Sequence, residues 1–289
     1  MSFKEKFFPV TAEIKMKPLC PGKGEISPVG SAYDHGIILR HETNKNYLLL
    51  RPILLIIKNQ LYRLEIKNKE NLWDLKELLK HNSVVIYINH LTSVDPLFIM
   101  SNLLEEGDFD FQIVAPVSRK HYDFFRKPLS ALAFRIGQGL GIKLYPIVQH
   151  YDHQSYSEKE DSRLALRFFS QFKKLSQQPG TVFLIAPEGT RNEFGVSLQP
   201  AQPGIGLMAK INPEVYFAPV GIVPQEKITS GLNFGRQFAL VYGKPFQLDQ
   251  LEVKDKTRIE IAQDLMTRLA NLLPESMRGE YQLLSKIAS

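Results

Sequence analysis

Short apolar runs of strand length alternate with helical segments along most of this chain, and the alternation limits the folds that it can adopt. Strands are expected over 62–66, 84–89, 112–116, 142–148, 181–185, 215–221 and 238–242. Helices are expected over 47–61, 72–80, 96–104, 127–137, 159–177, 203–210, 257–273 and 274–287. Strand–helix alternation is typical of α/β proteins, whose sheets are covered by helices on both faces. We therefore expect an α/β fold with a mixed, mostly parallel sheet flanked by helices.

The chain divides into a loop-rich beginning and one larger domain. Prolines and glycines recur through residues 1–45, which is typical of an extended leader. Residues 46–289 are long enough for a single domain, which the last two predicted helices, over 257–287, would close. The composition, 44% hydrophobic and 23% charged, excludes global disorder, collagen-like repeats and a polytopic membrane protein.

The net charge is +6 and is unevenly distributed. Residues 112–150 hold six basic side chains and one acidic side chain. Such a stretch suits an anionic membrane surface, an anionic substrate or nucleic acid, or is simply a solvated face. Because no nucleic-acid-binding motif accompanies it, we expect no nucleic-acid partner.

The sequence offers little for a metal or a disulfide. Cys20 is the only cysteine, so neither an internal disulfide nor a zinc cluster of cysteines is possible. His150 and His153 are three residues apart, but no further ligand set accompanies them. We expect neither a metal nor a cofactor.

The segment YLLLRPILLIIKNQLY, residues 47–62, is the most apolar stretch near the start of the chain. Arg51 and Lys58 interrupt it, and it falls short of the about twenty apolar residues of a membrane span. The pattern suits a core helix and a helix lying on a membrane surface equally well. Residues 1–10 lack the apolar run of a signal peptide, so neither a signal peptide nor a clear transmembrane helix is expected.

A histidine and an aspartate stand just after the first buried strand. His90 directly follows the strand 84–89, and Asp95 comes five residues later, immediately before Pro96. Proline is common in the first turn of a helix, so the aspartate is expected at a helix start. A carboxylate on Nδ1 of the histidine would fix the ring tautomer and leave Nε2 to take a proton from a hydroxyl. The alternative is an aspartate helix cap beside a hydrogen-bonded surface histidine.

A second group of functional side chains follows the strand 181–185. Gly189 would let a ligand approach the backbone closely, and Arg191 would hold a phosphate through two hydrogen bonds. Thr190 would donate another hydrogen bond, and Glu188 would accept one from a substrate hydroxyl or from Arg191. The alternative is an ordinary turn with a surface ion pair. Together the two groups supply a base for an alcohol and a grip for a phosphate, which suits acyl transfer onto a phosphorylated alcohol.

Three stretches in this order resemble the glycerolipid acyltransferase family. They are Asn89-His90, four residues and Asp95 (an HX4D motif); Pro187-Glu188-Gly189-Thr190-Arg191; and a strand ending in Pro219-Val220. The chain is similar above all to 1-acyl-glycerol-3-phosphate (lysophosphatidate) acyltransferases, over residues 47–245. The helix that begins near Gln202-Pro203-Gly204 also resembles the one that follows the second motif in this family.

The resemblance implies a role for each matching residue. His90 would be the general base on the acceptor hydroxyl, and Asp95 would orient its ring. The implied acceptor-binding residues are Glu188, Gly189, Thr190 and Arg191, with the arginine on the phosphate. Pro219 lies in the strand that such enzymes place near the acyl-donor site.

One position departs from the family pattern. The family usually places an arginine at the end of a strand between the two motifs, where this chain has Gln149. A neutral amide cannot replace a guanidinium as a charge partner, so Lys120 or Lys143 would have to contribute to phosphate binding. The acceptor therefore stays open between lysophosphatidate, glycerol-3-phosphate and another lysolipid.

The resemblance implies an acyltransferase of phospholipid biosynthesis that works at a membrane surface. The acyl group would pass from acyl-CoA or from acyl carrier protein (acyl-ACP) to lysophosphatidate, giving phosphatidate. Because these lipids are insoluble, we expect peripheral association with the cytoplasmic face of a membrane. Alternatives are a non-catalytic protein that binds lipid, a basic module that binds a membrane or a carrier protein without catalysis, and a lipid hydrolase that uses the same histidine.

Overall fold

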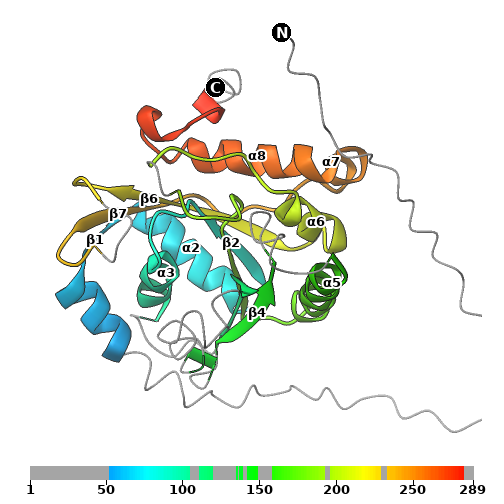
Figure 1. Ribbon diagram of the computed structural model, residues 1–289, viewed down its shortest axis with the longest axis horizontal. Coiled ribbons are helices and arrows are strands. Elements are labelled where there is room, and N and C mark those ends of the chain that lie inside the picture. The colour runs from blue at the N-terminus through cyan, green and yellow to red at the C-terminus, as the bar shows by residue number, and fades with distance from the viewer. Residues whose placement is uncertain are drawn as a thin grey trace, which may run out of the picture. The chain divides into compact units, whose positions relative to one another are not determined.

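The strands and helices of the computed structural model follow the predicted alternation along the chain (Figure 1). The described residues are 52–104, 111–119, 135, 137–138, 142–148, 158–192, 196–228 and 233–282, and all belong to one compact unit, His41–Ser289. Outside them lie the predicted leader 1–45, most of the predicted helix 127–137, and Cys20, Lys120, Gln149, His150 and His153. The domain boundary near residue 46 therefore stays a prediction.

Seven strands of the described residues form one sheet. They are β1 (Arg63–Lys67), β2 (Val84–Ile88), β3 (Gln112–Ser118), β4 (Lys143–Ile147), β5 (Thr181–Ile185), β6 (Tyr216–Pro224) and β7 (Gln237–Tyr242). Their order across the sheet is β1-β7-β6-β2-β5-β3-β4. The strands from β6 to β4 run parallel to one another, β7 pairs antiparallel with β6, and β1 pairs parallel with β7. The sheet is mixed and mostly parallel, which confirms the predicted fold class.

Helices flank the sheet on both sides. They are α2 (Lys69–Leu79), α3 (Asp95–Leu103), α5 (Glu158–Leu175), α6 (Gly204–Ile211), α7 (Gln250–Asp255) and α8 (Arg258–Ala270). Figure 1 shows α6, α7 and α8 along one side of the sheet and α2 and α3 along the other. A capping box begins α8, because the Thr257 hydroxyl accepts from the Glu260 amide while the Glu260 carboxylate accepts from the Thr257 amide.

The apolar segment near the start of the chain forms a helix over 52–61, and its last part, η1 (Ile57–Leu61), is a π-helix. This helix packs against α3 and β1. Its Leu54 is buried, whereas Ile53 and Ile56 keep 46% and 53% of their surface exposed. The helix thus has one face in the core and one apolar face outside it. No helix within the described residues is both long enough and apolar enough to cross a membrane.

The prediction of one closing helix over 274–287 is wrong for its described part. Pro274 is extended, and only the short 3-10 turn η4 (Glu275–Met277) follows it. Gly279 then adopts a φ of +55°, a left-handed conformation that interrupts a helix, and helical residues resume only at Tyr281. A Cβ at Gly279 would lie 2.3 Å from the carbonyl oxygen of Leu198, so this turn passes close to the segment around Leu198.

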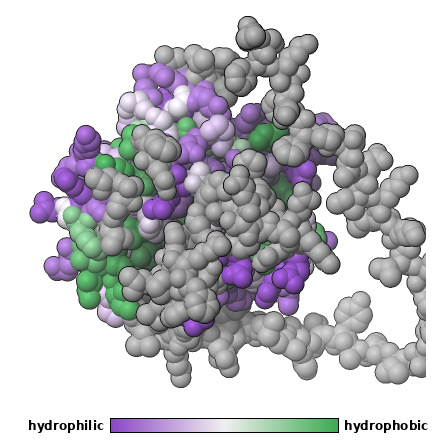
Figure 2. All heavy atoms as spheres, in the orientation of Figure 1, coloured by the Kyte–Doolittle hydropathy of each residue, from purple (hydrophilic) through white to green (hydrophobic). Residues whose placement is uncertain are grey.

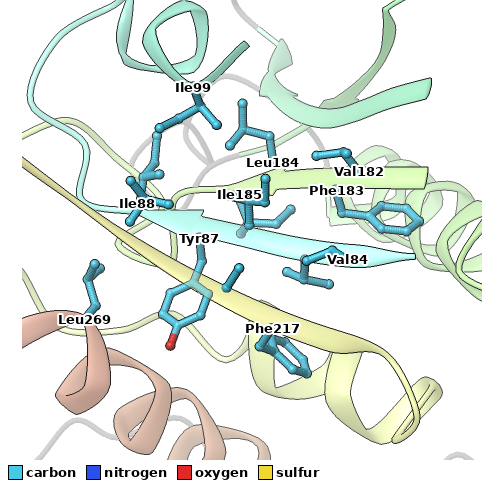
Figure 3. Close-up of a cluster of buried hydrophobic side chains, with 14 of the residues drawn as sticks. Val84, Tyr87, Ile88, Ile99, Val182, Phe183, Leu184, Ile185, Phe217 and Leu269 are labelled. Carbon is cyan, nitrogen blue, oxygen red and sulfur yellow. The ribbon is translucent and has the colours of Figure 1, made fainter. Parts of the chain in front are cut away.

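The two central strands β2 and β5 are buried on both faces, which explains their uninterrupted apolar sequences. Figure 3 shows Tyr87 directed toward α8, where Leu269 lies, and Phe217 on the same side of the sheet, whereas Ile99 of α3 lies on the opposite side of β2. The rings of Tyr87 and Phe217 meet edge to face, with 6.4 Å between their centroids. This packing holds β2, which ends two residues before His90.

The register brings the carboxyl ends of β2 and β5 side by side. The two strands are parallel, and Tyr87 pairs with Ile185 near their ends. The segments that follow, beginning at Asn89 and Ala186, therefore leave the sheet at the same edge. In α/β sheets of this kind, ligands bind at the carboxyl ends of the strands.

Candidate active site

Asn89 extends the pairing of β2 with β6 by one residue through its side chain. Its Nδ2 donates a hydrogen bond to the Ile222 carbonyl oxygen at 2.9 Å, and the Ile222 amide donates one to its Oδ1 at 2.7 Å. The side chain is buried, so the two bonds satisfy polar groups that water does not reach. Asn89 therefore anchors the chain at the residue that precedes His90.

His90 and Asp95 form a hydrogen-bonded pair at the start of α3. Nδ1 of His90 lies 3.0 Å from Oδ2 of Asp95. We assign the ring proton to Nδ1 from this bond, so that Nε2 carries the free electron pair. Among the described residues Nε2 has no hydrogen-bond partner, and the side chain keeps 21% of its surface exposed. The ring is therefore able to accept a proton from a bound molecule.

The Asp95 carboxylate is completely buried and is held by hydrogen bonds on both oxygens. Besides the His90 ring, its donors are the amides of Leu91 and Thr92, at 2.6 and 2.8 Å, and the Thr92 hydroxyl, at 2.5 Å. These donors belong to the turn between the histidine and the aspartate, so the carboxylate is fixed relative to the ring. A carboxylate in this position holds a histidine base in one tautomer and one orientation.

The turn that follows β5 requires a glycine. The Gly189 amide donates to the Ala186 carbonyl oxygen at 3.0 Å, and Gly189 has a φ of +71°. Residues with a side chain rarely adopt this left-handed conformation. A Cβ at this position would also lie 2.9 Å from Cγ of Gln202. Both the backbone conformation and the neighbouring side chain therefore favour glycine.

Two hydrogen bonds join this turn to the segment between His90 and Asp95. Nη1 of Arg191 donates to Oγ of Ser93 at 2.9 Å. The Asn192 amide donates to the His90 carbonyl oxygen at 3.1 Å. The guanidinium therefore stands beside the turn that carries the histidine–aspartate pair, and an anion bound to it would lie at the same edge of the sheet as Nε2.

Glu188 is nearly completely buried, with 3% of its surface exposed. Its Oε1 accepts a hydrogen bond from the His90 amide at 2.8 Å, and its Oε2 accepts one from the Gln199 amide at 2.9 Å. Burial raises the pKa of Glu188 to about 7; the two backbone hydrogen bonds oppose the rise, and the nearby Asp95 carboxylate adds to it. The carboxylate thus connects the backbones of His90 and Gln199.

Most of the predicted site residues come together at this edge of the sheet. They are His90, Asp95, Glu188, Gly189, Thr190 and Arg191. The Thr190 hydroxyl donates to the carbonyl oxygen of Arg191 at 3.3 Å. The structure does not bring Lys143 to this group, and Lys120 lies outside the described residues.

Lys143 lies well away from the histidine–aspartate pair. It is the first residue of β4 and pairs with Val114, which pairs with Phe183 and through it with Val85. Val85, the residue of β2 in this row of the sheet, stands five residues before His90. At about 3.3 Å per residue, the separation along the strands alone is roughly 16 Å.

Sequence reasoning gives no role to several polar residues that build the site. Thr92 supplies two of the hydrogen bonds on Asp95, and Asn192 holds the His90 carbonyl group. Thr92 lies within the first motif and acts partly through its hydroxyl, so a polar side chain at a strand end is a usable signal there, whereas Asn192 acts through its backbone amide. Gln199 acts through its backbone amide, which its residue type does not reveal.

Comparison with known families agrees with this geometry. A family model described as Acyltransferase matches residues 63–223, which is more than half of the chain and includes both segments of the site. No curated protein matches the chain. The chain belongs to the acyltransferase family, the family of glycerolipid acyltransferases such as the lysophosphatidate acyltransferases.

Proposed function

We propose that this acyltransferase moves a fatty acyl group from an acyl thioester, acyl-CoA or acyl-ACP, to the hydroxyl group of a lysophospholipid. One observation carries the proposal: Nδ1 of His90 is held by the buried Asp95 carboxylate at 3.0 Å, while the ring remains partly exposed. This arrangement suits a general base, because the ring can take a proton at Nε2 and the carboxylate stabilises the charge that results.

The proposed reaction proceeds in one direct displacement. The acceptor hydroxyl lies against Nε2 of His90 and gives up its proton as its oxygen forms a bond to the thioester carbonyl carbon. The carbon–sulfur bond then breaks, its electron pair leaves on sulfur, and the proton passes from the imidazolium to the thiolate. The products are the acylated lipid, a free thiol and the neutral histidine. No cofactor enters this sequence.

Arg191 is the proposed ligand of the acceptor's phosphate. Its guanidinium lies beside the turn between His90 and Asp95, through the bond to Ser93, and a guanidinium offers a phosphate two parallel hydrogen bonds. A phosphate held there would orient a lysophosphatidate hydroxyl toward the base, so lysophosphatidate, which would become phosphatidate, is the proposed acceptor. Glycerol-3-phosphate and other lysolipids are the alternative acceptors.

Peripheral contact with the cytoplasmic face of a membrane is part of the proposal, because the lipid substrates partition into a bilayer. Ile53 and Ile56 form the exposed apolar face of the helix 52–61, and the exposed Phe234 contacts Tyr62 just after this helix, with 5.8 Å between ring centroids. Figure 2 shows an apolar area, in green, where Figure 1 places this helix, in blue. Apolar side chains on a surface helix are typical of proteins that lie on a membrane.

The test is an assay of thiol release from a long-chain acyl-CoA and from acyl-ACP. Each donor is mixed with lysophosphatidate, with glycerol-3-phosphate or with no acceptor, and the lipid product is identified by mass. Release that depends on lysophosphatidate and yields phosphatidate is the expected result.

The other outcomes are distinguishable. Release that requires glycerol-3-phosphate or another lysolipid would keep acyl transfer and change the acceptor. Release without any acceptor would indicate a hydrolase. Lipid binding without release from either donor would indicate a non-catalytic lipid-binding protein and would contradict the proposal.

A further inference from the structure

The backbone of His90 is held on both sides by the segment that follows β5. Its amide donates to Oε1 of Glu188 at 2.8 Å, and its carbonyl oxygen accepts from the Asn192 amide at 3.1 Å. The ring is held separately, by Asp95 at 3.0 Å. Two buried carboxylates therefore fix the same histidine, one through its ring and the other through its main chain.

The surroundings of Glu188 do not suit contact with a substrate. Only 3% of its surface is exposed, and each of its two oxygens already accepts a hydrogen bond from a backbone amide, that of His90 or that of Gln199. Because the side chain is buried, a substrate hydroxyl could reach either oxygen only if the residues that cover it moved away. Arg191, in the same segment, bonds instead to the exposed Ser93, which lies between His90 and Asp95.

The other partner of Glu188, the Gln199 amide, belongs to a segment that is hydrogen-bonded to the carboxy-terminal part of the chain. On the two sides of Gln199, the Leu198 amide donates to the Met277 carbonyl oxygen at 2.8 Å, and the Ala201 amide donates to the Tyr281 hydroxyl at 2.9 Å. Glu188 thus connects His90 to a stretch of chain that the carboxy-terminal turn supports.

We propose that Glu188 is a positioning residue of the acyl-transfer site: its carboxylate spans the His90 and Gln199 amides and so sets where the imidazole stands, and it does not bind the acceptor. The proposal rests on the proposed function of His90 as the base. It also changes the role that the family resemblance implies for this glutamate.

Replacing the carboxylate by an amide tests the geometry directly. In Glu188→Gln the side chain keeps one accepting oxygen, but its NH2 group must face the second backbone amide, donor against donor. Either His90 or Gln199 then loses its partner. Glu188→Asp keeps the charge but is one methylene shorter, so that it cannot reach both amides. The two variants remove the same bridge in different ways, and either suffices if the other does not fold.

The experiment measures kcat and the acceptor KM of the full-length chain, with Glu260→Gln as the matched control. Glu260 also accepts from a backbone amide, that of Thr257, but in the capping box of α8. We expect Glu188→Gln to lower kcat roughly 10- to 100-fold, as a small displacement of a reacting group does. We expect the acceptor KM to stay near the wild-type value in Glu188→Gln and in Glu260→Gln. We expect kcat to stay near the wild-type value in Glu260→Gln.

A rise in acceptor KM with unchanged kcat would overturn the proposal, because it would identify Glu188 as an acceptor ligand. Unchanged kcat and KM in a folded Glu188→Gln variant would overturn it as well. Loss of kcat in Glu260→Gln to the same extent would show that the effect is general destabilisation, and would also contradict it.

A second measurement separates this proposal from the proposed function. In protein labelled with ¹⁵N at histidine, the ring signals of His90, assigned from their absence in His90→Ala, should shift in Glu188→Gln and not in Glu260→Gln. If the wild type transfers no acyl group, the proposed function fails while this shift still tests the positioning. Unshifted ring signals would overturn the positioning role even in an active enzyme.

Discussion

Nη1 of Arg191 donates a hydrogen bond to Oγ of Ser93 at 2.9 Å, although 98 residues separate them in the chain. Ser93 lies between His90 and Asp95, so this bond connects the proposed phosphate ligand to the turn that carries the proposed base. The covalent structure of an acceptor limits the distance between its phosphate and its attacking hydroxyl. A connection between the two protein segments therefore suits an enzyme that binds the phosphate and the hydroxyl of one acceptor together.

Arg191→Ala should mainly weaken acceptor binding. Loss of hydrogen bonds to a charged group should raise the KM for a phosphate-bearing acceptor roughly 10- to 100-fold, with a smaller effect on kcat. Arg191→Lys should keep only part of the wild-type affinity for the acceptor, because an ammonium lacks the planar fork of a guanidinium. Steady-state kinetics with varied lysophosphatidate measure the effect.

The control is Arg236→Ala, which removes an arginine that pairs with Glu226 at the surface. This variant should bind the acceptor as the wild type does. An unchanged acceptor KM in Arg191→Ala would remove the arginine from the proposed phosphate site.

Asp95→Asn should nearly abolish turnover while the chain still folds. The new NH2 group would face the donors that now point at the carboxylate, and the ring of His90 would lose the acceptor that selects its tautomer. We expect kcat to fall roughly 10⁴-fold, the effect of the same change in a serine protease triad. Thr92→Val, which removes the hydroxyl bond to Asp95 and the longer bond that the hydroxyl accepts from the Val94 amide, should cause a smaller fall. Equal activity in Asp95→Asn and the wild type would contradict the role of this pair.

The sequence predicts the fold well where strands are buried on both faces. The runs that form β2 and β5 are continuous and apolar because each face packs against helices, and their predicted ends lie within one residue of the observed ones. The carboxy-terminal stretch fails for a local reason. Its apolar spacing suggests one helix, but Pro274 is extended and Gly279 is left-handed, so the chain turns twice.

The site is predictable in its residues and not in its connections. His90 and Arg191 can be placed at the same edge because both follow strands of a parallel sheet. Sequence order does not reveal that β5 lies next to β2, and the bridge from Glu188 to the His90 amide depends on that neighbourhood. Lys143 is expected to contribute only because Gln149 replaces an arginine. It is the first residue of β4 and so lies at the opposite edge of the parallel sheet, as its place at the start of the predicted strand already indicates.

Gly189→Ala should destabilise the chain and disturb the site. A φ of +71° costs a residue with a side chain about 1–2 kcal/mol, and the new Cβ would lie 2.9 Å from Cγ of Gln202. Combining it with Gln202→Ala relieves the contact but not the backbone conformation, so the double variant should recover only part of the stability. Urea unfolding measures the stability of the single variant and of the double variant. Full recovery in the double variant would show that the contact alone requires the glycine.

Glu188 should make the stability of the chain depend on pH. Folding raises its pKa from the ordinary value of 4.5 to about 7, so the folded chain binds this proton more tightly than the unfolded chain. Its contribution to the free energy of unfolding is therefore greatest below pH 4.5, declines as the pH rises, and levels off above pH 7. The difference between the two limits is about 3 kcal/mol.

The decline is measured by urea unfolding of the wild type and Glu188→Gln at several values between pH 4.5 and 8. His90, Asp95 and Tyr281 also face this carboxylate, so the difference between the two proteins, rather than either curve, reports on Glu188. The difference in free energy of unfolding between the wild type and Glu188→Gln should change steadily between pH 4.5 and 8. Parallel curves would contradict the raised pKa.

The most direct test of the central claim is the rate of acyl transfer to lysophosphatidate in His90→Ala. Positioned base catalysis contributes about 10²–10⁴-fold, so this variant should lose at least about a hundredfold in kcat while its unfolding curve stays close to that of the wild type. His81→Ala is the matched control, since His81 is exposed and lies before the opposite end of β2, and it should transfer acyl groups at the wild-type rate. A folded His90→Ala variant with near wild-type kcat would contradict the assignment of the base.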